Sequence, residues 1–272
     1  MTTKTVLVTG TSSGIGLATA VALAEAGWHV IATMRDTGKA GALLAAAGER
    51  ANLEVRALDV TDPASVTACL DGLDRLDAVV NNAGAGHVGT LELDSIEEVR
   101  GVMEVNFFGV LTVSKAALPL LRASGGRLLT VTSVGGVVGQ PFNEAYCAAK
   151  FAVEGYLESL APVAAQQGVT VSVIEPAAVA SEFVANVGGI GPELQQDERY
   201  GKPFQSYLAH VQGAFAAAQP VREAAEVIVA TLTAEQPPFR VQTSERAKAV
   251  AALKLADTDG SAVQAVTSAW IA

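Results

Sequence analysis

The sequence predicts a doubly wound α/β fold, with a parallel sheet of about seven strands and helices on both faces. Short β-branched runs alternate with longer helical patterns through the first two thirds of the 272 residues. Several runs are apolar throughout, as are strands buried on both faces. Half of the residues are hydrophobic and 17% are charged, which provides for a large core and excludes disorder as the main state.

The predicted strands and helices alternate along the chain. The strands are Thr5–Val8, His29–Thr33, Leu53–Leu58, Ala78–Val80, Arg127–Thr132, Thr170–Ile174 and Phe239–Gln242. The helices are Ile15–Ala26, a helix starting at Pro63, Asp94–Val99, Glu104–Arg122, Tyr146–Gln167 and Val221–Leu232. Gly27 suits the end of the first helix, and Asp62 and Asp94 are expected N-caps.

The composition changes after Pro176, where glycine and proline become frequent and no periodicity is clear until Phe204. Apolar residues then recur at helical spacing, at Phe204, Tyr207, Leu208, Val211 and Phe215. We expect one domain over residues 1–272, with a substrate-binding segment at 181–220 inserted after the sixth strand. The apolar helix within it is either a lid over the substrate or a core-facing helix.

The charge balance narrows the function classes. With 18 Lys+Arg against 28 Asp+Glu, the net charge is −10, which argues against nucleic acid and anionic membranes as partners. No uninterrupted apolar run is long enough to span a bilayer. Cys69 and Cys147 lie in no metal-binding spacing and form no disulfide framework, so we expect no metal and a cytoplasmic location.

A glycine-rich turn follows the first predicted strand and opens the first helix. Its candidate cofactor-binding residues are Gly10, Ser12, Ser13, Gly14, Ile15 and Gly16. Glycines let the backbone turn tightly and approach a pyrophosphate, and the helix N-terminus supplies N–H groups and a positive dipole end. The turn therefore predicts a dinucleotide site, against the alternative of an ordinary strand-to-helix turn.

The end of the second strand indicates which dinucleotide binds. An NAD site usually has an acidic side chain there for the ribose 2′-hydroxyl, but Met34 occupies that position. Arg35 follows, and a guanidinium suits a 2′-phosphate. We therefore predict NADP(H). The alternative is that Arg35 is a solvated surface charge and Asp36 takes the acidic role.

Three further residues form a candidate proton-transfer site. Tyr146 and Lys150 are four residues apart on one helix face, and Ser133 lies just past the fifth strand. A free phenol has a pKa of about 10, too high for acid–base work at neutral pH. A lysine ammonium beside it is expected to lower that pKa. Ser133 can hydrogen-bond a substrate oxygen as charge develops there.

Together these motifs resemble the short-chain dehydrogenase/reductase superfamily over residues 4–182, which implies a Rossmann-type fold and hydride transfer to or from a nicotinamide. The matched set is Thr9–Gly16, Asn81-Asn82-Ala83-Gly84, Asn106, Ser133, Tyr146 and Lys150. The resemblance makes Tyr146 the general acid/base and implies that Asn106 keeps a water-linked proton relay beside Lys150.

The same resemblance extends the cofactor site. It implies that Lys150 binds the nicotinamide ribose and that Ser133 orients the carbonyl. Further cofactor contacts carried over are Asp59, Val60, Asn82, Ala83, Gly84, Val179 and Ser181. The family's usual Pro-Gly after the sixth strand is absent here, because Pro176 is followed by Ala177.

A closer resemblance runs from Ser133-Val134-Gly135-Gly136 through Pro141-Phe142-Asn143 and Tyr146–Leu160. These residues resemble the branch with 17β-hydroxysteroid and photoreceptor-type retinol dehydrogenases, which implies a bulky apolar ketone or secondary alcohol, steroid-like or polycyclic. Candidate substrate contacts are Val134, Phe142, Phe183 and His210, with His210 equally an ordinary surface or interface histidine. Retinoid alcohols, a 3-oxoacyl or polyketide ketoreductase, and a non-catalytic NADP-binding sensor stay open. The family also implies a homodimer or homotetramer, through the helices Glu104–Arg122 and Tyr146–Gln167.

Overall fold

The computed structural model describes residues 3–182, 187 and 192–272, and within them a seven-stranded sheet forms the centre of the fold. Its order is β3-β2-β1-β4-β5-β6-β9, and every neighbouring pair is parallel. The prediction of about seven parallel strands is confirmed. The strands are β1 Thr5–Thr9, β2 His29–Met34, β3 Leu53–Ala57, β4 Ala78–Asn81, β5 Arg127–Val131, β6 Thr170–Glu175 and β9 Arg240–Gln242.

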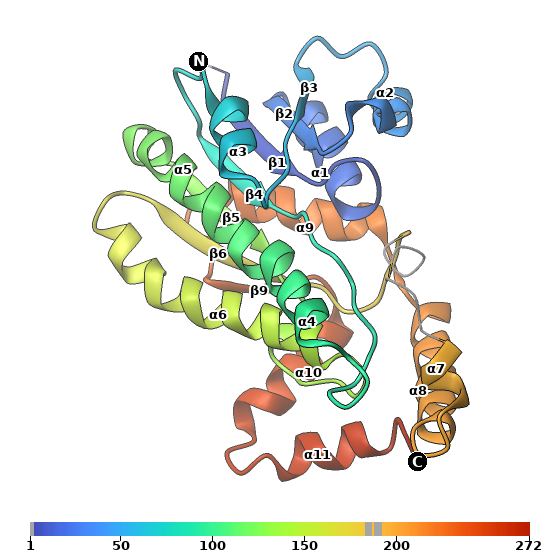
Figure 1. Ribbon diagram of the computed structural model, residues 1–272. Helices are drawn as coiled ribbons and strands as arrows, with labels where there is room; N and C mark the ends of the chain where they lie inside the picture. The colour runs from blue at the N-terminus through green and yellow to red at the C-terminus, as the bar shows by residue number, and fades with distance from the viewer. Residues whose placement is uncertain (1–2, 183–186, 188–191) are drawn as a thin grey trace.

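Helices cover both faces of this sheet (Figure 1). Alternate residues of β1 explain how, because Leu7 enters one hydrophobic cluster and Val6 and Val8 enter the other. The first cluster joins α3 (Pro63–Leu70), α5 (Gly109–Ser124) and α6 (Glu144–Ala165) to the sheet. The second joins α1 (Gly14–Glu25), α2 (Gly41–Ala47) and α9 (Val221–Thr233). The strands are apolar throughout because both their faces are buried.

Helix boundaries agree with the sequence in most places, with one correction at a cap. Asp62 accepts a hydrogen bond from the Ala64 N–H and caps α3, as predicted. The predicted cap at Asp94 is wrong: α4 (Ile96–Met103) begins after Ser95, which forms a capping box with Glu98. Asp94 instead contacts His87, at 3.0 Å.

Several short elements were not predicted from the sequence. They are α2, the 3₁₀ turns η1 (Thr37–Lys39) and η3 (Val134–Gly136), the π-helical turn η2 (Glu104–Phe108), α7 (Pro192–Gln196), α10 (Glu245–Ala256) and α11 (Ser261–Ser268). The segment between β6 and α9 holds α7 and α8 (Gly201–Ala216), and a two-stranded sheet of β7 (Val179–Ala180) and β8 (Gln219–Pro220) frames it.

The C-terminal residues return to α8, as Figure 1 shows from the position of the chain end. The Trp270 ring stacks on the His210 ring, with centroids 4.4 Å apart and planes inclined by 14°. Ile271 packs against a cluster that contains Phe204 and Tyr207 of α8. The last residues therefore contribute to the surroundings of the segment predicted to bind substrate.

Among the described residues, one continuous helical run, Ile96–Ser124, is long and apolar enough to cross a membrane by length and composition alone. Core helices pass the same test. Val113, Ala117 and Leu121 of this run lie in the first core cluster, so burial in the core explains why the helical run is apolar.

Candidate active site

The turn after β1 is shaped by glycines that have no room for a side chain. Gly10 and Gly14 have φ values of 70° and 57°, in the left-handed region. A Cβ on Gly16 would lie 2.2 Å from the Gly10 carbonyl oxygen and 2.4 Å from the Asn82 amide nitrogen. The Asn82 amide itself donates to the carbonyls of Thr9 and Gly10, at 2.9 and 3.0 Å. The turn after β4 is thus hydrogen-bonded to the turn after β1.

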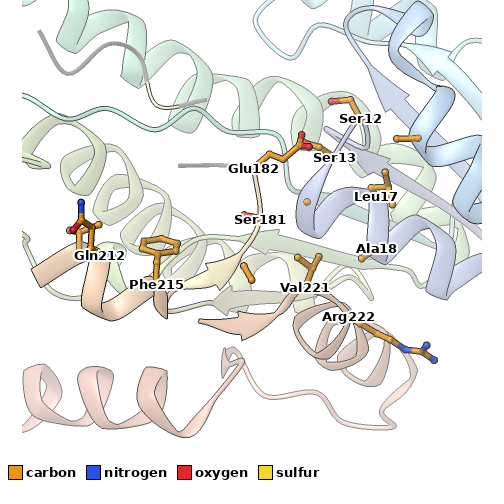
Figure 2. Close-up of a pocket in the computed structure, with 14 residues that line it drawn as sticks. Ser12, Ser13, Leu17, Ala18, Ser181, Glu182, Gln212, Phe215, Val221 and Arg222 are labelled. Carbon is orange, nitrogen blue, oxygen red and sulfur yellow. The ribbon is translucent and has the colours of Figure 1, made fainter. Parts of the chain in front are cut away.

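A cavity of about 830 Å³ lies against this turn (Figure 2). Ser12, Ser13 and Gly14 line it from the turn after β1, Ser181 from directly after β7, and Phe215 and Val221 from α8 and α9. A Cβ on Gly14 would be 3.3 Å from the Ser181 Cβ. The α1 N-terminus, with no cap bond from the Ser13 side chain, opens onto this cavity. Backbone N–H groups, a dipole end and a cradle that only glycine permits fit a dinucleotide pyrophosphate.

The next strand ends carry the residues predicted to bind the adenosine half. Arg35 is exposed directly after β2, whereas Met34 is buried and Val60 lies in the first core cluster. Asp59 accepts hydrogen bonds from the Thr61 N–H and hydroxyl. These bonds, with a smaller contribution from Arg35, hold the pKa of Asp59 below its usual value. Arg35 and Asp59 therefore lie within electrostatic reach of each other.

Ser133, Tyr146 and Lys150 come together at the carboxyl end of β5. A Cβ on Gly135 would lie 3.3 Å from both the Ser133 oxygen and a Tyr146 ring carbon. The Lys150 amine donates to the Val131 carbonyl at 3.1 Å and lies 5.8 Å from the centre of the Tyr146 ring. Lys150 is buried, while Ser133 and Tyr146 are half-buried.

Burial dominates the ionisation of this group. It raises the pKa of Tyr146 to about 12, although a hydrogen bond with the Ser133 side chain acts in the opposite direction. Burial lowers the pKa of Lys150 to about 8, and the charge on Glu154 opposes that change. Burial is the largest influence on the pKa of Tyr146 and raises it, opposite to the direction expected from a neighbouring ammonium.

Asn106 lies in the π-helical turn η2, a type of irregularity frequent at functional sites. Its amide donates to the carbonyls of Ala85 and Val102, at 2.9 and 3.1 Å, and its oxygen accepts from the Ala85 N–H. A Cβ on Gly84 would lie 2.9 Å from the Asn106 oxygen and 3.6 Å from the Lys150 amine. Gly84 thus keeps a narrow gap open between the two polar groups.

The predicted substrate contacts that the structure describes lie in different environments. Val134 is buried in η3, and its N–H donates to the Pro176 carbonyl. His210 stacks on Trp270, which favours the packing interpretation of this histidine. Phe183 lies outside the described residues. Val179, a predicted cofactor contact, is buried in β7.

Phe142 connects the α6 N-terminus to α8. Its φ is 58°, unusual for a residue with a side chain, and it packs against Phe204 and Tyr207, with ring centres 5.1 and 5.5 Å away. The Asn143 amide donates to the Tyr207 hydroxyl at 2.6 Å. These contacts, which the sequence did not reveal, join α8 to the helix that carries Tyr146.

Sequence reasoning also missed a buried charged group beside Lys150. Glu154 follows Lys150 by one helical turn and contacts Arg240 of β9 at 2.7 Å. Its spacing from Lys150 was the available signal, but a charged helix residue is usually a solvated one.

The model of the family described as short chain dehydrogenase matches residues 4–189. The chain belongs to the short-chain dehydrogenase family. Bovine retinol dehydrogenase 8 is 40% identical over 276 residues, covering 95% of the chain and 87% of the relative. Human 17-beta-hydroxysteroid dehydrogenase type 1 is 40% identical over 274 residues, covering 96% and 84%. The predicted family and branch are confirmed, and this short-chain dehydrogenase is an oxidoreductase.

A solved structure gives the same fold. A short chain dehydrogenase from Burkholderia cenocepacia J2315, in complex with NADP, has a TM-score of 0.78 and 25% identity to this short-chain dehydrogenase. The match covers 97% of each chain.

Proposed function

We propose that this short-chain dehydrogenase interconverts a bulky apolar ketone and its secondary alcohol by NADP(H)-dependent hydride transfer, with Tyr146 as general acid/base. The observation that carries the proposal is the meeting of Ser133, Tyr146 and Lys150 at the end of β5, on the same sheet edge as the glycine-rich turn after β1. In open parallel sheets, ligands bind outside the carboxyl ends of the strands.

When bound, the nicotinamide cofactor supplies the hydride to the carbonyl carbon during reduction or accepts it during oxidation. Tyr146 gives its proton to the carbonyl oxygen in reduction and takes it back in oxidation. A pKa of about 12 keeps the phenol protonated at neutral pH, as a proton donor must be. The Ser133 oxygen accepts from the Gly135 N–H, which leaves its own proton to donate. A positive charge on Lys150 stabilises the phenolate after the proton leaves.

The preference for NADP(H) is supported by the residues after β2. Arg35 is exposed beside the predicted adenosine position, and buried Met34 carries no acceptor for a ribose 2′-hydroxyl. The carboxylate of Asp36, the alternative acidic residue, already accepts from the Gly38 N–H at 2.9 Å. We expect a higher kcat/KM with NADPH than with NADH, and Arg35→Ala to reduce this ratio by tenfold or more, the effect of about 1.4 kcal/mol. Equal or better use of NADH by the unmodified enzyme contradicts the cofactor proposal.

Replacing the phenol tests the chemical step. Tyr146→Phe removes only the hydroxyl, so we expect kcat to fall by about 10²–10⁴-fold, the usual contribution of a general acid/base. NADPH affinity, measured by cofactor fluorescence, should stay within about twofold, since the α1 turn is untouched. Turnover at the unmodified rate would show that Tyr146 is not the proton donor.

The aromatic cluster of Phe142, Phe204 and Tyr207 supports the substrate class. Phe142 lies next to the N-terminus of α6, the helix that carries Tyr146. Because the retinol and steroid relatives are equally similar, at 40% identity, one panel with NADPH should include 17-oxosteroids, decalones, retinal and short 3-oxoesters. We expect the polycyclic ketones to have the highest kcat/KM. Preference for the short esters would instead favour a 3-oxoacyl reductase.

We also propose a homo-oligomer formed through α5 and α6. Large apolar side chains stay exposed along this side of the molecule: Phe108 is 47%, Phe151 39% and Tyr156 48% exposed. Phe107 joins Phe108 to Tyr156 by edge contacts, so these three rings form one patch. Contiguous apolar patches on a protein surface commonly mark interfaces, and a second copy would cover this one.

A further inference from the structure

A network of charged groups lies beside the proposed proton-transfer site, and hydride transfer does not explain it. Glu154 of α6 is 3% exposed, and Glu175 at the end of β6 is fully buried. One Arg240 nitrogen donates to both carboxylates, at 2.7 and 2.8 Å. A second Arg240 nitrogen donates to exposed Glu158 at 3.1 Å. Arg240 and buried Lys150 together balance the charges of the two buried carboxylates.

Both oxygens of Glu154 are occupied by donors. One oxygen accepts from the Thr132 hydroxyl at 2.5 Å, and the other accepts from Arg240. The hydroxyl proton is available for this bond, because the Ile174 carbonyl already accepts from the Thr132 N–H at 2.8 Å. Two donors, one directly after β5 and one in β9, therefore fix the position of the Glu154 carboxylate.

Lys150 lies one helical turn before Glu154, a spacing at which a lysine and a glutamate commonly pair. Both residues lie in the described part of the chain, and no ion pair joins them. The Lys150 amine instead donates to the Val131 carbonyl at 3.1 Å. It lies 5.8 Å from the centre of the Tyr146 ring and would be 3.6 Å from a Cβ on Gly84. The amine is thus held at the site while other donors hold its helix neighbour.

We propose that Arg240 is a positioning residue for Lys150: together with Thr132 it binds the Glu154 carboxylate and so prevents it from drawing the amine away from Tyr146. The effect on turnover rests on the proposed function, because it requires the roles of Tyr146 and Lys150 given there. The effect on the position of the amine does not depend on those roles.

Loss of Arg240 would leave one Glu154 oxygen without a donor in a buried place. An unpartnered buried carboxylate is strongly unfavourable, so it binds a cation within reach. Lys150 is such a cation, since side chains four residues apart are neighbours on a helix and an ammonium has three protons to donate. Glu175 differs, because its second oxygen keeps the bond from the Gln242 amide at 2.8 Å. The amine would therefore move toward Glu154.

A crystal structure of Arg240→Gln tests the position of the amine without requiring turnover. We expect the Lys150 Nζ within about 4 Å of a Glu154 oxygen, the distance of an ion pair. Glu158→Gln is the matched control, because it removes an exposed carboxylate from the same Arg240 and should leave the amine on Val131. An amine that stays on Val131 in Arg240→Gln, or that leaves it in Glu158→Gln, overturns the proposal.

Ketone reduction with NADPH tests the effect on the reaction. Burial raises the pKa of Glu154 to about 7, so the variants are compared at about pH 8, where the carboxylate form predominates. In Arg240→Gln we expect kcat to fall by about 10²-fold, an effect that a shift of about 1 Å in a positioned group can have. Adding Glu154→Gln removes the carboxylate that draws the amine and should recover most of the lost kcat. A double variant no faster than Arg240→Gln contradicts the proposal.

A second double variant separates positioning from charge balance. Arg240→Gln with Glu175→Gln also removes one buried carboxylate that Arg240 bound, but leaves Glu154 able to pair with Lys150. If Arg240 served only to balance buried charge, both double variants should recover kcat and melting temperature equally. We expect kcat to recover with Glu154→Gln and to stay low with Glu175→Gln. Equal recovery in the two double variants overturns the proposal.

Thr132→Val covers the case in which Arg240→Gln does not fold. It keeps the shape of the side chain and removes the hydroxyl that holds the other Glu154 oxygen. The released oxygen should pair with Lys150, so kcat should fall, and Glu154→Gln should restore it because residues of one network do not act additively. Failure of Glu154→Gln to restore kcat in Thr132→Val is the contrary result.

The structural and kinetic measurements together separate this proposal from the proposed function. If the amine moves to Glu154 in Arg240→Gln while kcat is unchanged, Arg240 does not position Lys150 for the reaction and the proposal fails. If the amine moves and Tyr146→Phe turns over at the unmodified rate, the proposed function fails, and the effect of Arg240 on the position of the amine stands.

Discussion

Glycines border the proposed cofactor and proton-transfer sites where any side chain would collide with fixed atoms. Gly16 faces a backbone carbonyl and an amide that is itself hydrogen-bonded to β1, so neither neighbour can move easily. Gly84 faces Asn106 and Lys150, two buried groups. The absence of a side chain at Gly16 and Gly84 therefore determines how closely the backbone can approach a ligand.

Gly16→Ala should consequently destabilise the protein and weaken NADPH binding. Its Cβ would require a shift of the Gly10 backbone, and overpacking of this kind costs about 1–3 kcal/mol. Urea unfolding measures the loss, and fluorescence titration measures NADPH affinity. Gly101→Ala is the matched control, because that glycine of α4 is exposed with nothing within 4 Å, and alanine there should stabilise by about 0.5–1 kcal/mol. Equal effects of the two changes would contradict this account.

At the scale of elements, α6 explains both the success and the limit of prediction from sequence. Its helical pattern and the spacing of Tyr146 and Lys150 were readable, because both depend on local periodicity. The burial of Glu154 was not, because its ion-pair partner Arg240 lies 86 positions away along the chain. Similarly, Asn106 was identified by motif, but the π-helical turn that holds it has no local signature.

The C-terminal helices were missed for a different reason. In α10 the buried residues are Ala247 and Ala251, and in α11 they are Val263 and Thr267. The small buried side chains of α10 leave little hydrophobic periodicity in the sequence, and α11 is only 8 residues long. Trp270 stacks on His210 and joins this end of the chain to α8. Nothing in the sequence indicates that these two residues pair.

Trp270→Ala should loosen the contact between the chain end and α8. Loss of a stacked ring pair costs about 0.5–1.5 kcal/mol beyond the lost burial, so the melting temperature should fall. Burial and the Arg246 charge lower the pKa of His210, and uncovering the ring should raise that pKa toward its ordinary value. NMR titration of the imidazole protons measures this change. A His210 pKa that stays the same or falls would show that Trp270 does not desolvate the ring.

For the whole molecule, the sheet and the site at its edge were the most predictable features. Strands that are apolar on both faces and alternate along the chain with helical patterns indicate a parallel sheet between two helical layers, so the fold class could be predicted from the sequence pattern. The site follows, because turns after β1, β2, β4 and β5 all open at the carboxyl edge. The surface that a second copy would cover is harder to predict from the sequence. Exposed and core-facing apolar residues alternate within α5 and α6, so their spacing does not separate the two kinds.

The proposed oligomer makes a prediction about molecular mass. If the aromatic patch of Phe107 and Phe108 in η2 and Tyr156 in α6 lies at the interface, the protein should sediment at a multiple of its 27.8 kDa chain mass. Phe108→Glu combined with Tyr156→Glu places charges in the apolar contact and should yield monomers, because buried unpaired charges are strongly unfavourable. Leu255→Glu is the control, since that residue is 66% exposed on α10, a helix that carries none of the patch residues. Sedimentation equilibrium decides the matter: a 27.8 kDa species for the unmodified protein, or an unchanged assembly in the double variant, excludes this interface.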